Sequence, residues 1–327
     1  MESKHLVSVV IPTHKTRERT LRCLAALWLC NPQPDEVIVV DDGSADNTAH
    51  SVLRKYPRHI VVHLPKRHGF AAAINHGVAR ASGDLLFLLD NSTEVDPSAI
   101  GAIRRTFEAN EDLGVGGADL RLPNGDPQWS GGRLPNSLWC FTLASGLPSL
   151  LDRLKTWRKL RSFTRHRKGR VDWVSGAAMV VRRNVWDEIG PFDAGYRIRG
   201  QYLDLCVNAA EAGWKIEIAP DIRAVYPANG PTSEECEHPE TSDEELMWAD
   251  LLRFARKRHG KNGARQSGRA LRMGGRLRVI GRQMAAPLVS KDHQKEWQAE
   301  TDACVKALRV LTSAPATDQP APPKPAG

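Results

Sequence analysis

The sequence predicts an α/β protein with a Rossmann-like, doubly wound and mostly parallel sheet, followed by basic C-terminal helices. Two observations support this fold class. Short apolar runs alternate with segments of helical spacing over roughly the first hundred residues. Later, Leu251–Lys291 contains twelve basic residues and no acidic one. The 327 residues are enough for one large or two small domains.

Four apolar runs predict buried parallel strands because they are rich in β-branched or aliphatic residues and end at turn residues. These runs are Leu6–Ile11, Glu36–Val40, Ile60–Leu64 and Leu85–Leu89. Helices are expected at Thr20–Leu29, after the capping residue Ser44, at Phe70–Ala81 and at Pro97–Ala109. Ligands of such sheets bind beyond the carboxyl ends of the strands, so Pro12–Thr13, Asp41–Asp42 and Asp90 should share one rim.

The alternation stops after Leu113. Residues 120–150 are rich in Pro, Gly, Asn and Ser and predict a long loop region. Asp204–Gly213 predicts a further helix and Lys215–Ala219 a further strand. We therefore expect a domain at 1–235, a basic helical extension at 236–312, and a disordered, Pro- and Ala-rich tail at 313–327.

Bulk properties narrow the partners and the compartment. A net charge of +8 favours polyanions such as phosphates and acidic membranes. The six cysteines form no C-x-x-C pair and no zinc spacing, which predicts scattered thiols in a reducing cytosol. The sequence contains no run of 18 apolar residues, so no membrane span is predicted. The N-terminal run is interpreted as a strand, because no small-residue cleavage site of a signal peptide follows it.

Five sequence blocks carry a specific resemblance. They are VSVVIPTHKTRERTLRCLAAL, EVIVVDDGSADNT, HGFAAAINHGVARASGDLLFLLDNSTEVDP, VDWVSGAAMVVRRNVWDEIGPFD and YLDLCVNAAEAGW. In this order and spacing the chain resembles family 2 glycosyltransferases, in particular their bacterial rhamnosyltransferase-like branch. The resemblance covers roughly residues 5–230. It implies the GT-A fold, an inverting reaction, a UDP- or dTDP-sugar donor and a divalent metal, Mg²⁺ or Mn²⁺.

The residues that match the family block by block are candidate binding residues. The resemblance implies nucleotide binding by the rim residues and by the loop and helix after the third strand: Pro12, Thr13, Asp41, Asp42, Gly69, Asn75, Asp90 and Asn91. It implies contacts with the donor sugar and the acceptor by Trp173, Ser175, Gly176 and Ala177. Asp41 and Asp42 can also serve only as a turn and a helix cap. Arg197 and Arg199 can neutralise a diphosphate or lie in a solvated loop.

The positions that perform chemistry in the family are changed. Ser92 stands where the metal motif ends in aspartate, so the expected metal ligands, Asp90 and Ser92, should bind weakly. Gln201 and Tyr202 stand where the family carries the Glu-Asp pair that supplies the general base. Glutamine accepts no proton, and the ordinary tyrosine pKa is about 10. Asp204 is the nearest surviving carboxylate, although a structural role is the competing interpretation.

Two other expected family residues are also absent. Asn208 replaces an arginine, and Pro227 replaces a histidine that commonly binds metal or diphosphate. Three functions therefore compete. The first is a transferase that moves a hexose or deoxyhexose to a glycan or lipid-linked acceptor in cell-surface polysaccharide synthesis. The second is an inactive relative that binds or regulates a partner. The third, nucleic-acid binding by the basic segment, lacks any recognised reading motif.

The basic segment has its own predicted role. Apolar residues recur among the cations of residues 251–291, as in helices that lie on a membrane surface. We expect two or three short helices there, because six glycines interrupt the segment, and we expect them to bind an anionic membrane. The predicted location is cytoplasmic, peripheral at the inner face of the cell membrane.

Overall fold

The computed structural model describes residues 5–147, 169–227, 243–288 and 294–313, which form two compact units. Unit 1 comprises residues 1–134, 161–194 and 201–237, and unit 2 comprises 135–160, 195–200 and 238–327. The last division is close to the predicted boundary after residue 235. The assignment of two earlier segments to unit 2 was not foreseen, because it depends on contacts distant in sequence. Residues 314–327 of the predicted tail lie outside the described residues.

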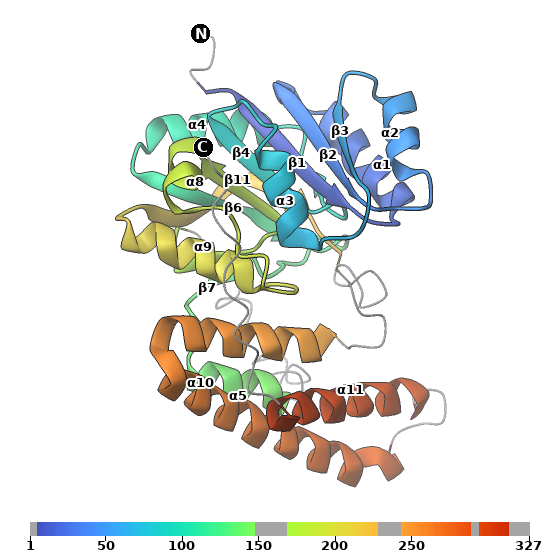
Figure 1. Ribbon diagram of the computed structural model, residues 1–327, viewed down its shortest axis with the longest axis vertical. Coiled ribbons are helices and arrows are strands. Elements are labelled where there is room, and N and C mark those ends of the chain that lie inside the picture. Colours follow the sequence, from blue (N-terminus) through green and yellow to red (C-terminus); the bar gives the residue numbers. More distant parts are fainter. Residues whose placement is uncertain (1–4, 148–168, 228–242, 289–293, 314–327) are drawn as a thin grey trace. The chain divides into compact units, whose positions relative to one another are not determined.

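Unit 1 is built on a mixed sheet of nine strands (Figure 1). Its main path runs β3 (Ile60–Leu64), β2 (Glu36–Asp42), β1 (Val7–Thr13), β4 (Leu85–Leu89), β10 (Ala178–Arg182), β6 (Leu113–Arg121), β11 (Lys215–Val225) and β5 (Glu94–Val95), and β8 (Gly169–Arg170) pairs with β11. The first four strands are parallel, and β10 runs antiparallel between β4 and β6. The predicted α/β class with a mostly parallel sheet is confirmed.

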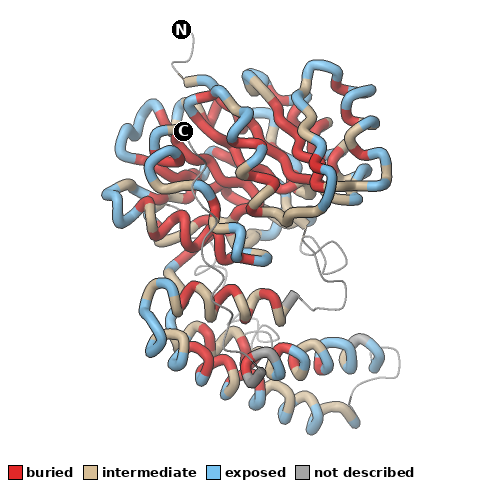
Figure 2. Tube along the Cα trace, in the orientation of Figure 1, coloured by how far each residue is buried: buried red, intermediate tan, exposed pale blue. Residues whose placement is uncertain are grey.

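Helices cover both faces of this sheet. They are α1 (Arg17–Trp28), α2 (Thr48–Lys55), α3 (Phe70–Val78), α4 (Ala99–Ala109), α8 (Arg183–Ile189) and α9 (Gly200–Glu211). Alternate residues of β1 point to opposite faces. Val9 belongs to a buried apolar cluster that includes residues of α1 and α4, whereas Val10 belongs to a second cluster that includes residues of α3, α8 and α9. Figure 2 shows that the central strands of the sheet, β1, β2, β4, β6 and β10, are almost entirely buried.

The first strand extends further than its sequence indicates. Pro12 was expected to end the strand, yet it pairs with Val40 of β2. On the other side of β1 the pairing with β4 stops at Val10. Beyond Val10 the β4 side of β1 has no ladder partner, and a residue without an N–H is tolerated at such a strand edge. The extension carries Thr13 to the level of Asp41, with which it pairs.

Unit 2 contains α5 (Ser137–Ser145), α10 (Asp243–Ala285), the 3₁₀ turn η2 (Ala286–Leu288) and α11 (Gln294–Ser313). The prediction of a loop throughout 120–150 is wrong at α5. Asn136 caps this helix by accepting from the Trp139 N–H at 2.8 Å, and Gly146 ends it with a φ of 64°. Apolar residues lie all round this helix, although only Cys140, Ala144 and Ser145 are buried and Leu138 is 70% exposed. It gives no amphipathic signal, so its caps are the features from which it could have been found.

The basic segment forms longer helices than expected. The glycines of the basic segment were expected to divide it into two or three short helices, and the non-helical backbone at Gly260, where φ is 63°, does divide α10 into two helices. The second of these helices is longer than expected, because it continues to Ala285 past the remaining glycines. Other glycines allow close helix packing. A Cβ at Gly274 would lie 2.5 Å from the Phe141 carbonyl oxygen, and one at Gly275 would lie 2.6 Å from the Trp248 ring. Glycine is therefore required at positions 274 and 275 by close tertiary packing, and it does not interrupt the helix there.

Two predictions from composition can be compared with the structure. The cysteines of the described residues, Cys23, Cys30, Cys140, Cys206 and Cys304, are free and buried, as expected of scattered thiols. Cys236 lies outside the described residues. Within the described ranges, no helix combines the length and the apolar character needed to cross a bilayer.

Candidate active site

The carboxyl ends of β1 and β2 bring Thr13, Asp41 and Asp42 together, as the sequence predicts. All three side chains are buried. The Thr13 hydroxyl lies 2.7 Å from the Thr20 hydroxyl and 3.0 Å from that of Thr16. Thr13 therefore ties the rim to the start of α1, a bond that the sequence did not reveal.

Both aspartates bond to neighbouring groups of unit 1. Asp41 accepts from the Ser44 N–H at 3.0 Å and from Nδ1 of His63 at 3.3 Å. Asp42 accepts from the backbone N–H groups of His68 and Gly69, each at 2.8 Å. The two aspartates therefore do stabilise turns, which is one of the two interpretations of their sequence. Since a carboxylate offers about four acceptor sites, capacity for a nucleoside remains, and that contact stays a prediction.

The loop before α3 depends on these bonds. Gly69 has a φ of 92°, which glycine adopts without strain, and this turns its N–H toward Asp42. Further along α3, the Asn75 amide donates to the Phe192 carbonyl at 2.9 Å and accepts from the Phe192 N–H at 3.0 Å. Asn75 thus anchors the segment that leads toward α9. Its predicted contact with nucleotide is untested.

Basic groups surround the aspartate pair. His14 donates from Nδ1 to the Asp42 carbonyl at 2.7 Å, and Nδ1 of His68 lies 3.6 Å from the Asp42 carboxylate. Burial lowers the pKa of His14, and the charges of Arg67 and Lys15 act in the same direction. A bound phosphate would oppose that effect, because a nearby negative charge favours the protonated ring.

The predicted metal motif lies in a tight turn after β4. Oδ1 of Asp90 accepts from the Ser92 N–H at 2.8 Å. The Asn91 amide donates to the Thr16 hydroxyl at 2.6 Å, and the Ser92 hydroxyl lies 3.4 Å from Oδ1 of Asn91. The turn is therefore held by its own polar groups and by the start of α1.

One carbonyl joins this turn to the predicted donor and acceptor segment. The Ala177 carbonyl accepts from the Asp90 N–H at 3.0 Å and from the Thr93 hydroxyl at 2.8 Å. Two residues earlier, the Ser175 N–H donates to the Ser130 carbonyl at 2.8 Å. The structure thus brings Ser175–Ala177 and Asp90 together, although they are distant in sequence.

Trp173 stands at the edge of this segment in the small sheet of β7 (Gly131–Gly132) and β9 (Trp173–Val174). Its indole N–H donates to the Arg133 carbonyl at 3.0 Å. Its ring meets Trp129 edge-on, with centroids 5.2 Å apart. The tryptophan pair is half-buried, so sugar stacking by Trp173 stays a prediction.

Tyr202, at the position of the family base, is packed as a core side chain. Its ring centroid lies 5.7 Å from that of Phe70 and 5.6 Å from that of Phe192, both edge-on. A Cβ at Gly176 would lie 1.7 Å from the Tyr202 ring. Gly176 is therefore required for this close approach, and Tyr202 has a packing role that its sequence position did not indicate.

The remaining base candidates lie on the same side of α9. Gln201 and Asp204 are three residues apart, which places them one above the other on the helix. Both side chains are buried, with 1% and 4% exposed. Asp204 thus lies about one helical turn from the position of the lost acidic pair. Its role as base stays a prediction.

Asp250 is a residue that sequence analysis missed. It is buried, and its carboxylate accepts from four consecutive backbone N–H groups, those of Arg197, Ile198, Arg199 and Gly200, at 2.8 to 2.9 Å. Backbone N–H groups before a helix otherwise lack partners, and a carboxylate there is favoured by the helix dipole. These bonds hold the backbone of the predicted arginine loop, while the Arg197 and Arg199 side chains are exposed. A separation of about fifty residues left no local signal.

The profile described as "Glycosyl transferase family 2" matches residues 8–189, which contain the rim, the Asp90 turn and the Ser175–Ala177 segment. The chain belongs to glycosyltransferase family 2. The expected resemblance to its rhamnosyltransferase-like branch is confirmed by relatives. One is the N-acetylglucosaminyl-diphospho-decaprenol L-rhamnosyltransferase of Mycobacterium tuberculosis, 23% identical over 239 residues, which cover 68% of this chain and 76% of that protein.

A second relative and a solved structure extend the comparison. The O-antigen biosynthesis protein RfbC of Myxococcus xanthus is 26% identical over 231 residues, which cover 67% of this chain but 17% of that protein. A mannosyltransferase from Pyrobaculum calidifontis, solved with GDP-Man and Mn²⁺, superposes with a TM-score of 0.55 at 15% identity. The match covers 95% of this chain and 87% of that one. This likeness supports the GT-A fold of the family 2 domain.

The residues of the Asp90 turn do not fit a metal site built by protein alone. Asp90 is the one carboxylate of the Asp90–Ser92 turn, and one of its oxygens is bonded to the Ser92 N–H. Within the described part of the chain, no group of three or more His, Cys, Asp or Glu side chains is arranged to hold a metal. An ion here would need diphosphate oxygens and water for most of its ligands, as Mg²⁺ often does. We derive no catalytic step through a metal.

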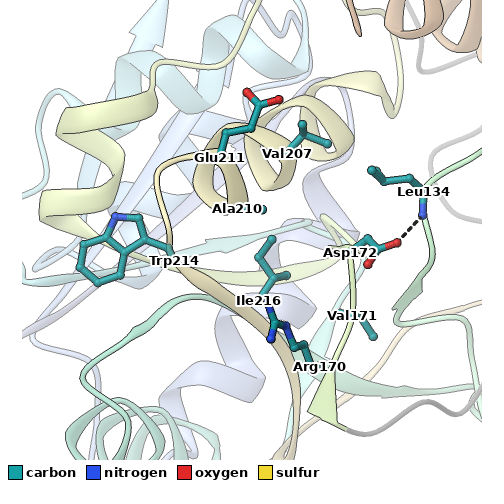
Figure 3. Close-up of a pocket in the computed structure, with 9 residues that line it drawn as sticks. All are labelled: Leu134, Arg170, Val171, Asp172, Val207, Ala210, Glu211, Trp214 and Ile216. Atoms are coloured by element: carbon teal, nitrogen blue, oxygen red, sulfur yellow. Dashed lines mark hydrogen bonds between the residues drawn. The ribbon is translucent and has the colours of Figure 1, made fainter. Parts of the chain in front are cut away.

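A separate pocket of about 260 Å³ lies in unit 1 beside the second half of α9 (Figure 3). Its wall combines apolar side chains such as Val207 and Trp214 with the charged residues Arg170, Asp172 and Glu211. Asp172 also accepts from the Leu134 N–H at 3.0 Å. The pocket contains none of the predicted catalytic or nucleotide-binding residues.

Proposed function

We propose that this family 2 protein is an inverting glycosyltransferase that moves a hexose or deoxyhexose from a UDP- or dTDP-sugar to a glycan or lipid-linked acceptor. The observation that carries the proposal is the bond pattern of the Ala177 carbonyl, which holds the donor and acceptor segment against the Asp90 turn. The rim of Thr13, Asp41 and Asp42 lies at the ends of the neighbouring strands. This arrangement supports a proposal in which the nucleotide and sugar sites adjoin in one unit.

In the proposed donor complex the nucleoside lies on the rim. Pro12 and Thr13 flank it, and the acceptor sites that Asp41 and Asp42 retain receive its base N–H and ribose hydroxyls. Gly69 and Asn75 shape the adjoining loop and helix. Asp90 and Asn91 lie toward the diphosphate, whose charge is opposed by the basic groups around His14 and Arg67.

The proposed reaction is a single displacement. The acceptor hydroxyl oxygen forms a bond to the anomeric carbon, while the bond from that carbon to the diphosphate oxygen breaks and its electron pair leaves with the diphosphate. Asp204 accepts the acceptor proton in the absence of the family's acidic pair. A positioned base of this kind contributes a factor of about 10² to 10⁴ in rate. Trp173 and Ser175–Ala177 position the two sugars.

The acceptor sets the proposed location. The relative from Mycobacterium tuberculosis is named for a decaprenol-linked acceptor, which supports a lipid-linked acceptor here. A cytoplasmic, peripheral position at the inner face of the cell membrane follows from such an acceptor and from the basic residues 251–291.

A transfer assay tests the proposal. Purified protein is incubated with UDP- and dTDP-hexoses and deoxyhexoses and with undecaprenyl- or decaprenyl-linked N-acetylglucosamine, and product is measured by mass spectrometry. We expect transfer from one donor and a loss of at least about 10²-fold in Asp204→Asn. Binding of UDP or TDP without transfer from any donor would indicate the inactive, binding role instead. Absence of nucleotide binding at millimolar concentration would overturn both.

A further inference from the structure

One face of α10 exposes a stripe of large apolar side chains after the break at Gly260. Met273, Leu277, Ile280 and Met284 are 62%, 46%, 54% and 76% exposed. Their spacing of four, three and four residues places them along one side of the helix. Single exposed apolar residues are ordinary on protein surfaces, but a continuous row of four is typical of an interaction surface.

Arginines flank this stripe along the same exposed face. Arg265, Arg269 and Arg276 are exposed, and none forms an ion pair with the part of the chain that the structure describes. Arginines on the opposite side of α10 have internal partners instead. Arg278 pairs with Glu244, and Arg282 pairs with Glu300 at 2.7 Å. The arginines on one side of α10 are therefore exposed to solvent, whereas those on the opposite side form ion pairs within unit 2.

Packing within unit 2 fixes which side of α10 faces outward. Leu271 is fully buried, and the close approach at Gly274 and Gly275 leaves no room for a side chain there. A rotation that hid the apolar stripe would bring Met273 or Leu277 against α5 in place of a glycine. The stripe is thus a fixed feature of the folded unit.

We propose that Met273, Leu277, Ile280 and Met284, with Arg265, Arg269 and Arg276, form a surface that binds an anionic phospholipid bilayer. A bilayer satisfies both components at once, because the apolar side chains enter below the headgroups while the guanidinium groups pair with lipid phosphates. A nucleic acid would engage the arginines and leave the apolar stripe in water. The biological purpose, access to a lipid-linked acceptor, rests on the proposed function, but the surface itself does not.

The test is co-sedimentation of the full chain with phosphatidylcholine vesicles that contain or lack phosphatidylglycerol. We expect binding only to the anionic vesicles, and a steep fall in binding between low and high salt. Two double variants, Leu277→Gln with Ile280→Gln and Arg269→Glu with Arg276→Glu, should each lower the partition coefficient more than about tenfold, since each basic residue near an anionic surface contributes measurably to binding.

Matched controls carry the same changes on unit 1. Leu29 and Leu53 are 68% and 47% exposed, and Arg54 and Arg58 are exposed, so Leu29→Gln with Leu53→Gln and Arg54→Glu with Arg58→Glu should leave vesicle binding within about twofold of the wild type, well short of a tenfold step. Equal losses in the controls, wild-type binding by the α10 variants, or equal binding to neutral vesicles would overturn the proposal. So would loss of binding to duplex DNA in the α10 variants while vesicle binding persists.

A parallel titration with UDP separates this surface from the proposed function. The α10 variants should bind UDP as the wild type does, because their changed side chains lie on unit 2. Vesicle binding without UDP binding would contradict the proposed function alone. UDP binding without vesicle binding would contradict the membrane surface and the proposed membrane location, and would leave the proposed transfer reaction standing.

Discussion

The two sides of the rim of unit 1 follow the family pattern to different degrees. On the β1–β2 side, the expected Thr13, Asp41 and Asp42 are present, and each bonds to another part of the unit. On the β4–α9 side, Ser92, Gln201 and Tyr202 replace carboxylates. Side chains on the first side contribute to folding as well as to the proposed binding site. The replaced carboxylates are those for which the family pattern implies chemistry.

The replacements have also acquired packing roles. Tyr202 fills the space above Gly176 and contacts two phenylalanines, which an aspartate at that position could not do. The α9 side of the rim is therefore stabilised by an aromatic cluster, and the β2 side by buried carboxylates. The following four changes test this difference, beginning with the largest expected effect.

Removing the Tyr202 ring should have the largest effect. Tyr202→Ala should lower the free energy of unfolding by about 3 to 5 kcal/mol, as for other large buried aromatic side chains. Tyr202→Phe keeps the ring and should cost less than about 1.5 kcal/mol. Urea unfolding of both variants measures the two values. If transfer activity falls more than about 10²-fold in Tyr202→Phe, the hydroxyl takes part in chemistry and the contrast between the two sides fails.

Removing the Asp42 carboxylate should affect stability and binding together. Asp42→Ala leaves the N–H groups of His68 and Gly69 without their acceptor, at a cost of about 2 kcal/mol. Titration calorimetry with UDP should show an affinity loss of more than about tenfold, which corresponds to about 1.4 kcal/mol. Asp42→Asn retains one acceptor oxygen, so its stability and its UDP affinity should lie between those of the wild type and those of Asp42→Ala. Normal UDP binding by a destabilised Asp42→Ala would restrict this residue to its structural role.

The effect of a divalent metal on nucleotide binding tests the β4–α9 side of the rim. Adding EDTA to the wild type should change nucleotide affinity less than about tenfold, or 1.4 kcal/mol. Ser92→Asp restores a carboxylate at the family's metal position, and Mn²⁺ should then strengthen UDP binding by about tenfold or more. Asp96→Ser, a change at a nearby carboxylate that accepts from the Ser98 N–H at 2.9 Å, serves as a control. A strong EDTA effect on the wild type would show that the remaining ligands suffice.

The smallest effect concerns His14. Burial holds its pKa below the ordinary value of about 6.5, so below that pH the unfolded chain binds more protons at this residue than the folded protein. His14 therefore makes stability fall as the pH drops from about 6.5 toward the lowered pKa. His14→Gln should reduce this slope in urea unfolding series between about pH 7 and 5. An unchanged slope would assign the pH dependence to other groups.

Much of unit 1 was predictable because its signals are local. Apolar runs such as Glu36–Val40 identify buried strands directly, and parallel strands carry their carboxyl ends to one edge. The rim of Thr13, Asp41 and Asp42 follows from that geometry without knowledge of any contact. Unit 2 was harder, because α5 is apolar all round and α10 contains glycines whose effect depends on the helix that packs against them.

The sequence by itself determined the α/β class, the family and the residues at the ends of the first strands. These follow from periodicity and motif spacing, which are properties of short segments. Tertiary structure alone decided that Asp250 holds the loop before α9 and that the Ala177 carbonyl joins the Asp90 turn. It also decided which side of α10 is exposed. Each depends on partners dozens of residues away, and a helix shows its outward side only once packing has buried the other.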